Sequence, residues 1–175
     1  DCTFGVSSLA FSPDGTLLVA GINSTAGDPE QGAYVWDVRN RSLKASLAGR
    51  QRSVRTVAWS SGNVIATGSV DESVRLWDGE SFEELDTLHT GGSVEVVAFS
   101  DDGERLLATT SRNNSVYVWD TASSRLLRTV KGHSRAVQGA VFVNGDKEIW
   151  SSSTDYMVKA WDLMKCEPFT RLESG

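Results

Sequence analysis

Few side chains in this sequence are suited to catalysis or metal binding. The 175 residues contain two histidines, His89 and His133, and two cysteines, Cys2 and Cys166. Two cysteines form neither a disulfide framework nor a cysteine-spaced zinc site. The motifs of a nucleophile elbow, a dinucleotide loop, a phosphate loop and a zinc-protease helix do not occur. We therefore expect no catalytic residue, no metal and no cofactor.

Carboxylates beside glycine are the remaining candidates for metal binding. The run Asp101-Asp102-Gly103 could offer oxygen ligands to calcium. Aspartate and glycine also dominate tight turns, where glycine supplies a positive φ angle and aspartate bonds to nearby backbone. We interpret these carboxylates as turn formers.

Charge and hydrophobicity narrow the range of partners. The net charge is −6, from 17 basic and 23 acidic residues, which disfavours a duplex nucleic-acid ligand. Apolar runs such as 140–143 have the length of a strand and fall far short of a membrane helix. The low cysteine content fits a reducing compartment, so we expect a cytoplasmic or nuclear protein with no membrane contact.

An internal repeat organises the whole chain. The dipeptide Trp-Asp recurs at intervals of 41, 42 and 42 residues, at Trp36, Trp77, Trp119 and Trp161. A second phrase precedes each one, as in Val54-Arg-Thr-Val-Ala-Trp-Ser60 and Val94-Glu-Val-Val-Ala-Phe-Ser100. A fixed period of this length is typical of stacked repeat units and outweighs local predictions.

Each repeat predicts four short strands. Apolar and polar residues alternate with a period of two, and turn residues interrupt them every 8 to 12 positions. In the first repeat the strands are expected near 6–12, 17–22, 33–38 and 43–48. No segment shows helical periodicity, so the fold class is all-β.

With its period and its Trp-Asp dipeptides, the sequence resembles the WD-repeat β-propeller family over nearly its whole length. The resemblance implies a partial propeller spanning residues 1–175, built from four blades, which are four-stranded antiparallel sheets. The expected blades cover approximately residues 5–48, 53–88, 93–130 and 136–173.

The family resemblance also implies a structural tetrad of hydrogen-bonded side chains in some blades. Its members are a histidine in the loop before the blade, a hydroxyl on the second strand, a turn aspartate and the tryptophan. The fourth repeat has all four: His133, Ser151, Asp155 and Trp161. The second repeat offers Thr67, Asp71 and Trp77 with Arg50 in place of histidine, and the third offers Thr109, Asn113 and Trp119 with Thr90 in that place. We expect one complete tetrad.

The trio of His133, Ser151 and Asp155 could instead be a nucleophilic triad. A catalytic serine needs an exposed position, commonly on a sharp turn, whereas Ser151 is expected inside a strand. We therefore assign the trio a structural role.

Four blades in a row leave an apolar face at each end unless the ring closes. The chain begins at Asp1 without a methionine, which suggests a piece of something longer. The family resemblance implies a larger ring of about seven blades, and we expect this chain to be part of one. Two chains forming an eight-blade ring are the second possibility, and a closed four-blade ring is the third.

The family implies a scaffold or adaptor that binds protein partners or peptides through the loops on one face of the disc. Six residues are expected to gather on that face as a partner-binding set: Arg50, Arg52, Arg55, Arg112, Arg135 and Gln138. Because arginine pairs bidentately with carboxylate and phosphate, a reader of acidic or phosphorylated peptides is the alternative function. Glu72 and Glu95 on the same loops argue against it, and a propeller enzyme is a distant third interpretation.

Overall fold

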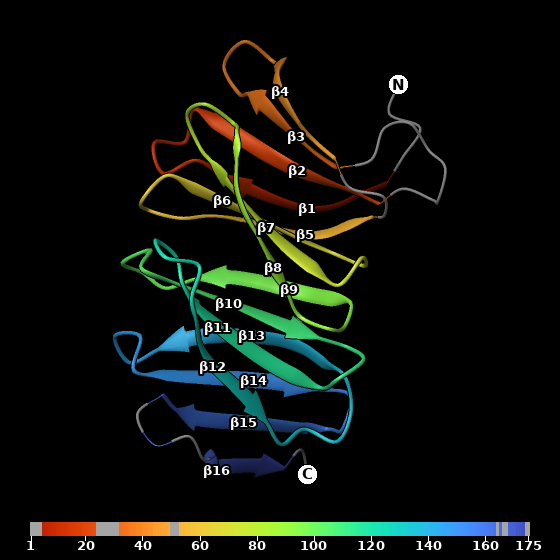
Figure 1. Ribbon diagram of the computed structural model, residues 1–175, viewed down its shortest axis with the longest axis vertical. Helices are drawn as coiled ribbons and strands as arrows, with labels where there is room; N and C mark the ends of the chain where they lie inside the picture. Colours follow the sequence, from red (N-terminus) through yellow and green to blue (C-terminus); the bar gives the residue numbers. More distant parts are fainter. Residues whose placement is uncertain (1–4, 24–31, 50–52, 164, 166–167, 174–175) are drawn as a thin grey trace.

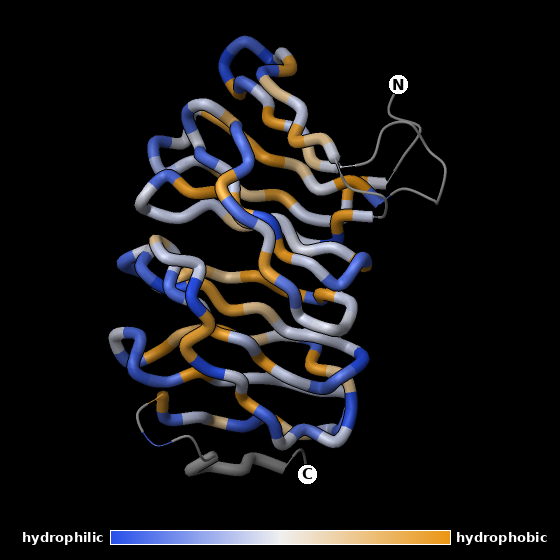
Figure 2. The backbone as a smooth tube through the Cα atoms, viewed as in Figure 1, coloured by the Kyte–Doolittle hydropathy of each residue, from blue (hydrophilic) through white to orange (hydrophobic). Residues whose placement is uncertain are grey.

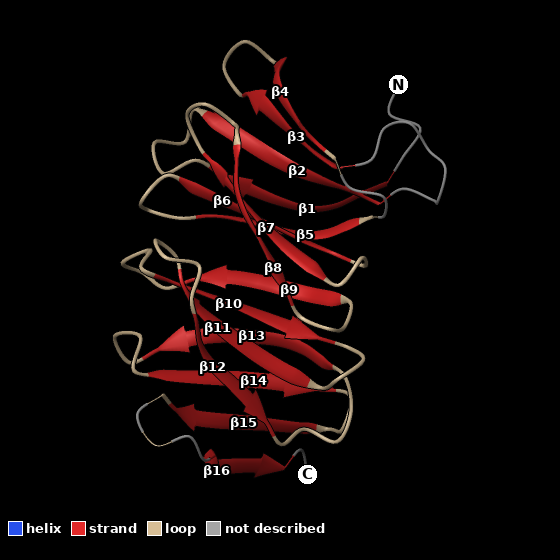
Figure 3. Cartoon of the chain, viewed as in Figure 1, coloured by secondary structure: helices blue, strands red, loops and turns tan. Residues whose placement is uncertain are grey.

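The computed structural model describes residues 5–23, 32–49, 53–163, 165 and 168–173, the last of these segments as backbone only. The described part consists of strands, turns and loops, without a helix (Figure 3). It therefore contains no helix that could cross a bilayer. The strands form four antiparallel sheets, and each sheet takes four strands in chain order.

The sheets stack one after another along the chain, from the first blade to the fourth (Figure 1). The first blade contains β1 (Gly5–Phe11), β2 (Leu17–Asn23), β3 (Gly32–Asp37) and β4 (Ser42–Ala48). The second contains β5 (Val54–Trp59), β6 (Val64–Ser69), β7 (Ser73–Asp78) and β8 (Glu84–His89). The third contains β9 (Val94–Phe99), β10 (Arg105–Thr110), β11 (Ser115–Asp120) and β12 (Leu126–Lys131). The fourth contains β13 (Val137–Val143), β14 (Glu148–Ser153), β15 (Met157–Asp162) and β16 (Pro168–Glu173).

One irregularity recurs at the tryptophan of every blade. The pairing between the third and fourth strands shifts its register at Trp36, Trp77, Trp119 and Trp161. A β-bulge at such a position adds a residue to one strand and increases the local twist. The repeat therefore encodes the same bend in each sheet.

Every blade from the second onward packs its tryptophan against the blade before it. Trp77 lies in a buried cluster with Val19 and Val35 of the first blade. Trp119 packs with residues of the second blade, and Trp161 with residues of the third. Burial of these large rings is a main source of cohesion between the sheets.

The array is open, and the two end faces expose apolar side chains. On the first blade, Phe11, Leu18, Trp36 and Leu43 are paired across the four strands and so share one face. Phe11 is 59% exposed. On the fourth blade the end face includes Val141, which is 53% exposed.

Strand ends gather at two edges of the array, where the backbone is more hydrophilic than in the strands (Figure 2). We call one the loop edge; it comprises the segments 70–72, 90–93, 111–114, 132–136 and 154–156. We call the other the turn edge; it comprises the segments 12–16, 38–41, 60–63, 79–83, 100–104, 121–125 and 144–147.

Candidate functional site

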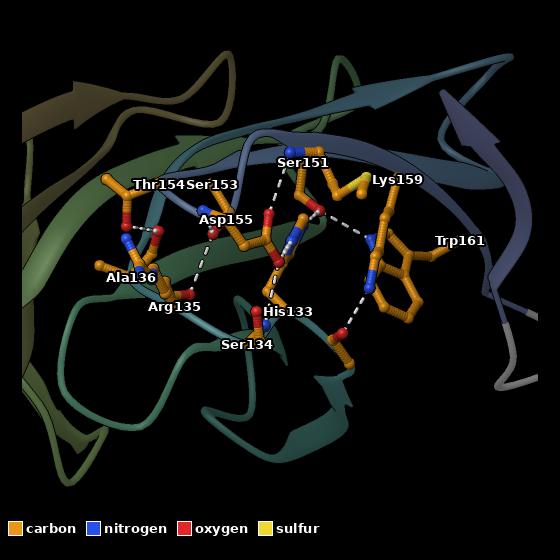
Figure 4. A network of polar contacts seen from close by, with 12 residues as sticks. His133, Ser134, Arg135, Ala136, Ser151, Ser153, Thr154, Asp155, Lys159 and Trp161 are labelled. Atoms are coloured by element: carbon orange, nitrogen blue, oxygen red, sulfur yellow. Dashed lines mark hydrogen bonds and ion pairs between the residues drawn. The ribbon is translucent and has the colours of Figure 1, made fainter. Parts of the chain in front are cut away.

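A network of polar contacts joins the loop before the fourth blade to β14 and β15 (Figure 4). Trp161 Nε1 donates to Ser151 Oγ at 2.7 Å, and this oxygen lies 2.8 Å from His133 Nε2. His133 Nδ1 lies 2.9 Å from Asp155 Oδ2. The hydroxyl accepts from the indole, so its proton is free to reach Nε2, while Nδ1–H is donated to the carboxylate. Every polar atom along this path therefore has a partner.

Asp155 stays ionised within this network. Burial by itself would raise the pKa of the carboxyl. Hydrogen bonds from the Ser134 amide, His133 and the Met157 amide outweigh it and lower the pKa to about 2. The two amide nitrogens lie 2.9 Å and 3.0 Å from the carboxylate oxygens. One side chain thus fastens both the loop at 133–134 and the turn at 155–157.

The trio in this blade has the hydrogen-bond spacing of a nucleophilic triad, but its serine is not accessible to a substrate. Ser151 is 2% exposed, and its oxygen is engaged by the imidazole and the indole together. A nucleophile must meet a substrate at its oxygen. This serine is closed off from solvent on a strand.

The loop backbone is fastened to the tryptophan in a second way. Gly132 has a φ of 153°, and a Cβ there would lie 2.8 Å from Trp161 Cη2, so glycine is required. The Lys159 ammonium donates to the Gly132 carbonyl and lies 6.0 Å from the centre of the Trp161 ring. Lys159 therefore links the loop to the indole face.

The third blade has no strand hydroxyl beside its tryptophan. The prediction that Thr109 fills this role is wrong, because the register pairs Ala108 with Tyr117 and so puts Thr109 on the opposite face. The turn at 111–114 is one residue longer than its counterpart in the second blade, 70–72. The Thr109 hydroxyl is buried without a hydrogen-bond partner in the described part of the chain.

A tyrosine lies beside this tryptophan instead. The rings of Tyr117 and Trp119 stack with centroids 5.4 Å apart and planes 15° apart. Asn113 Nδ2 donates to the Tyr117 hydroxyl at 2.8 Å and to the Thr90 carbonyl at 2.7 Å. The loop before the third blade is thus held through an amide and a phenol.

The residue pair beside the tryptophan, one residue on the second strand and one on the third, sorts the four blades into two kinds. In the second blade Trp77 Nε1 donates to Thr67 Oγ1 at 2.9 Å, as the equivalent pair does in the fourth. The cross-strand pairs of the second and fourth blades are Thr67 with Arg75 and Ser151 with Lys159. Those of the first and third blades are Ala20 with Tyr34 and Ala108 with Tyr117.

The structure does not bring the predicted arginines together as free cations. Arg50 and Arg52 lie outside the described residues. Arg55 forms an ion pair with Glu95, and Arg112 Nη1 lies 2.9 Å from Glu72 Oε1. Both glutamates lie on the neighbouring blade, so these ion pairs tie blade to blade.

The other two members of the set remain exposed. Arg135 and Gln138 both face solvent, and the Arg135 carbonyl accepts from Ser153 Oγ at 3.0 Å. Sequence reasoning named the two glutamates but missed their pairing with arginines. The signal was available, since each pair is 40 positions apart, one repeat along the chain.

The turn carboxylates act within their own turns. Asp102 accepts from Ser100 Oγ at 2.6 Å and from the Glu104 amide at 2.9 Å. Asp14 accepts from Ser12 Oγ at 2.6 Å in the first blade. These bonds are the side-chain-to-backbone pattern of a hairpin turn, and they support the turn-former interpretation.

The repeat, the four sheets and the recurring tryptophan together define a class of protein, and comparison with known families agrees. The family described as "WD domain, G-beta repeat" matches residues 2–37, 41–78 and 82–120, more than half of the chain. The chain therefore belongs to the WD-repeat family. These matches do not extend over the fourth blade, which holds the full hydrogen-bonded network.

Several curated proteins are similar to this chain. Protein SPA1-RELATED 3 of Arabidopsis thaliana is 33% identical over 74% of this chain and 16% of its own length. Eukaryotic translation initiation factor 3 subunit I of Pyricularia oryzae is 34% identical over 58% of this chain and 28% of its own. Periodic tryptophan protein 2 of Arabidopsis thaliana is 25% identical over 91% and 17%. The chain thus spans less than a third of the length of each of these relatives.

Proposed function

We propose that this chain is part of a non-catalytic scaffold that binds protein partners through its loop edge. The observation that carries this proposal is the fastening of loops to sheets. His133, Asp155 and Lys159 fix one loop, and Asn113 fixes another. A loop whose backbone is already fixed loses little backbone conformational entropy on binding, which favours recognition.

The comparisons support a role in assemblies. One relative is by name a subunit of a translation initiation factor. Family membership and exposed loop residues are consistent with protein partners here as well. The content of two cysteines fits a cytoplasmic or nuclear setting for this scaffold.

The test is affinity capture with the full-length parent protein. The variant Arg135→Glu with Gln138→Glu changes two exposed positions at the loop edge. The matched control, Arg39→Glu, makes the same kind of change at the turn edge, where Arg39 is exposed. Loss of partners from the double variant alone supports the proposal; equal capture by all three proteins contradicts it.

A second candidate function is the recognition of acidic or phosphorylated peptides. Arg135 favours it, because this guanidinium is exposed beside the fixed loop. Arg55 and Arg112 favour it less, since a phosphate would have to displace Glu95 and Glu72. A phosphopeptide array probed with the parent and with Arg135→Ala distinguishes this function from general scaffolding.

We also propose that further blades of a parent chain cover the two exposed end faces, with a second copy of this chain as the alternative. Phe11 and Val141 on these faces are more than half exposed, which is costly for side chains of this size. Solution mass measurement on the 175-residue chain separates the two, because a paired ring doubles the mass.

A further inference from the structure

Grooves form where neighbouring blades meet at the turn edge, and they differ in how they are filled. Between the first and second blades the groove has a volume of about 450 Å³ and contains Lys44, Trp59 and Phe82. Between the third and fourth blades a cavity of about 170 Å³ is lined by Arg128, whose Nε donates to the Leu163 carbonyl. Large or charged side chains thus line both.

The groove between the second and third blades has a larger volume, about 760 Å³. The repeat explains the difference position by position. Ser124 stands where Phe82 stands one blade earlier, and both residues have a positive φ of about 60° in turns of equal length. Leu85 stands where Lys44 stands, because Glu84 and Leu43 are the partners of the two tryptophans. The larger groove therefore coincides with two differences within the repeat, serine for phenylalanine and leucine for lysine.

The wall of this groove combines an apolar side chain with negative charge. Leu85 is 55% exposed and offers an apolar surface in the groove. Among the described residues, the lining of this groove contains no lysine or arginine. It contains four carboxylates, those of Asp86, Asp102, Glu104 and Asp120.

Two of the carboxylates in this lining, Asp102 and Asp120, have a lowered pKa. Hydrogen bonds from Ser100 and the Glu104 amide lower the pKa of Asp102, and hydrogen bonds from Ser123 lower that of Asp120. The charge of Arg105 also lowers the pKa of Asp102, but Arg105 does not line the groove, and its guanidinium donates to the Asp146 carbonyl at 2.7 Å. The charge of Arg125 also lowers the pKa of Asp120, but Arg125 does not line the groove. The groove therefore favours a cationic occupant.

The backbone beside the groove suits an extended chain. β8, which carries Leu85 and Asp86, is the outermost strand of its sheet, with β7 on its inner side. An outer strand offers N–H and C=O groups to a peptide, and side-chain pockets then give specificity. The volume also falls within the range of about 300–1,000 Å³ usual for ligand pockets.

We propose that the groove between the second and third blades binds a short extended segment of a partner protein, in which an apolar side chain is flanked by lysine or arginine. The apolar side chain packs on Leu85, and the flanking cations lie against Asp86, Asp102 and Asp120. This site does not depend on the loop edge, because Arg135 and Gln138 lie at the opposite ends of the strands.

The test is a titration of the 175-residue chain with three fluorescein-labelled peptides, followed by fluorescence polarisation and by NMR. The peptides are Gly-Arg-Leu-Arg-Gly, Gly-Arg-Ser-Arg-Gly and Gly-Glu-Leu-Glu-Gly. We expect saturable binding of the first, with shifts at Leu85 and Ser124, and binding at least about tenfold weaker for the other two.

Two variants close the groove with residues that the repeat already uses there. Ser124→Phe and Leu85→Lys should each weaken the binding of Gly-Arg-Leu-Arg-Gly by at least about tenfold. The control, Leu126→Lys, makes the same change at a leucine that is 48% exposed outside the groove, and should leave affinity unaltered. Thermal melting checks that each variant folds. The proposal is overturned by absence of saturable binding, by equal binding of the serine peptide, or by full binding to the folded Ser124→Phe variant.

Discussion

The third and fourth blades hold the same tryptophan by different means. In the fourth, a path of hydrogen bonds runs from the indole through Ser151 and His133 to Asp155. In the third, Tyr117 stacks on Trp119 and bonds to Asn113. Both arrangements tie the preceding loop to the third strand. Each blade therefore needs a link between loop and strand, and different residues can supply it.

The difference also shows which positions change together. Where the second strand carries a hydroxyl, its cross-strand partner is a long cation, as with Ser151 and Lys159. Where it carries alanine, the partner is tyrosine, as with Ala108 and Tyr117. A small residue makes room for an aromatic ring, and a hydroxyl serves the indole N–H directly.

The largest expected effect comes from removing the tryptophan itself. Trp119→Ala and Trp161→Ala should each lower the free energy of unfolding by about 3–5 kcal/mol, because both rings are nearly fully buried. Urea unfolding followed by circular dichroism measures it. Similar losses in the two variants support equivalent roles; a loss in one blade alone would break the comparison.

The next effect separates the two blades. His133→Ala should lower the free energy of unfolding by about 1–3 kcal/mol, because Ser151 and Asp155 lose a buried partner. His89→Ala removes an exposed histidine and is the matched control. An unchanged melting temperature for His133→Ala would falsify the structural role of the network.

Acid should affect the fourth blade through Asp155. Its pKa is about 2 in the folded chain and 3.8 as a free side chain, so the folded state binds its proton more weakly. The carboxylate therefore stabilises the fold fully above about pH 5, and this contribution is lost as the pH falls through 4 toward 2. Asp155→Asn should be less stable at pH 7 and should lose less stability on acidification. Urea unfolding at pH 7, 4 and 3 measures both; parallel pH profiles would contradict this account.

The smallest effect is expected at the stacked pair. Tyr117→Phe keeps the ring on Trp119 and removes one hydroxyl, while Asn113 retains its bond to the Thr90 carbonyl. We expect a loss of about 0.5–1 kcal/mol in the free energy of unfolding. Thermal melting of Tyr117→Phe is compared with that of Tyr117→Leu, because only the leucine variant abolishes the stacking on Trp119. A larger loss from phenylalanine than from leucine would show that the hydroxyl matters more than the ring.

Much of the fold was predictable because the repeat is regular. The tryptophan period and the alternation within each unit placed strands such as Leu17–Asn23 within one residue of their bounds. The contact of Trp77 with Thr67 agrees with the tetrad positions that the family resemblance implied. Regular spacing predicts well wherever turn lengths stay constant.

Two features escaped sequence reasoning for physical reasons. Thr109 was misplaced because one extra turn residue moves a strand position to the other face of its sheet. The ion pairs of Arg55 and Arg112 with carboxylates of adjacent blades were not foreseen, because the two partners lie far apart in the sequence. Contacts between blades depend on three-dimensional neighbours, although a separation of one period is a usable guide to them.

The orientation of the tryptophans gives the stack a direction. Each indole from the second blade onward packs against the preceding sheet. The free face of the first blade therefore carries a tryptophan, and the free face of the fourth blade is the kind of face against which a tryptophan packs. If the free faces of two first blades met, tryptophan would face tryptophan, and the free faces of the fourth blades would stay uncovered. Any additional module, whether covalently continuous or a separate molecule, must therefore join head to tail, in the same sense as the modules already present.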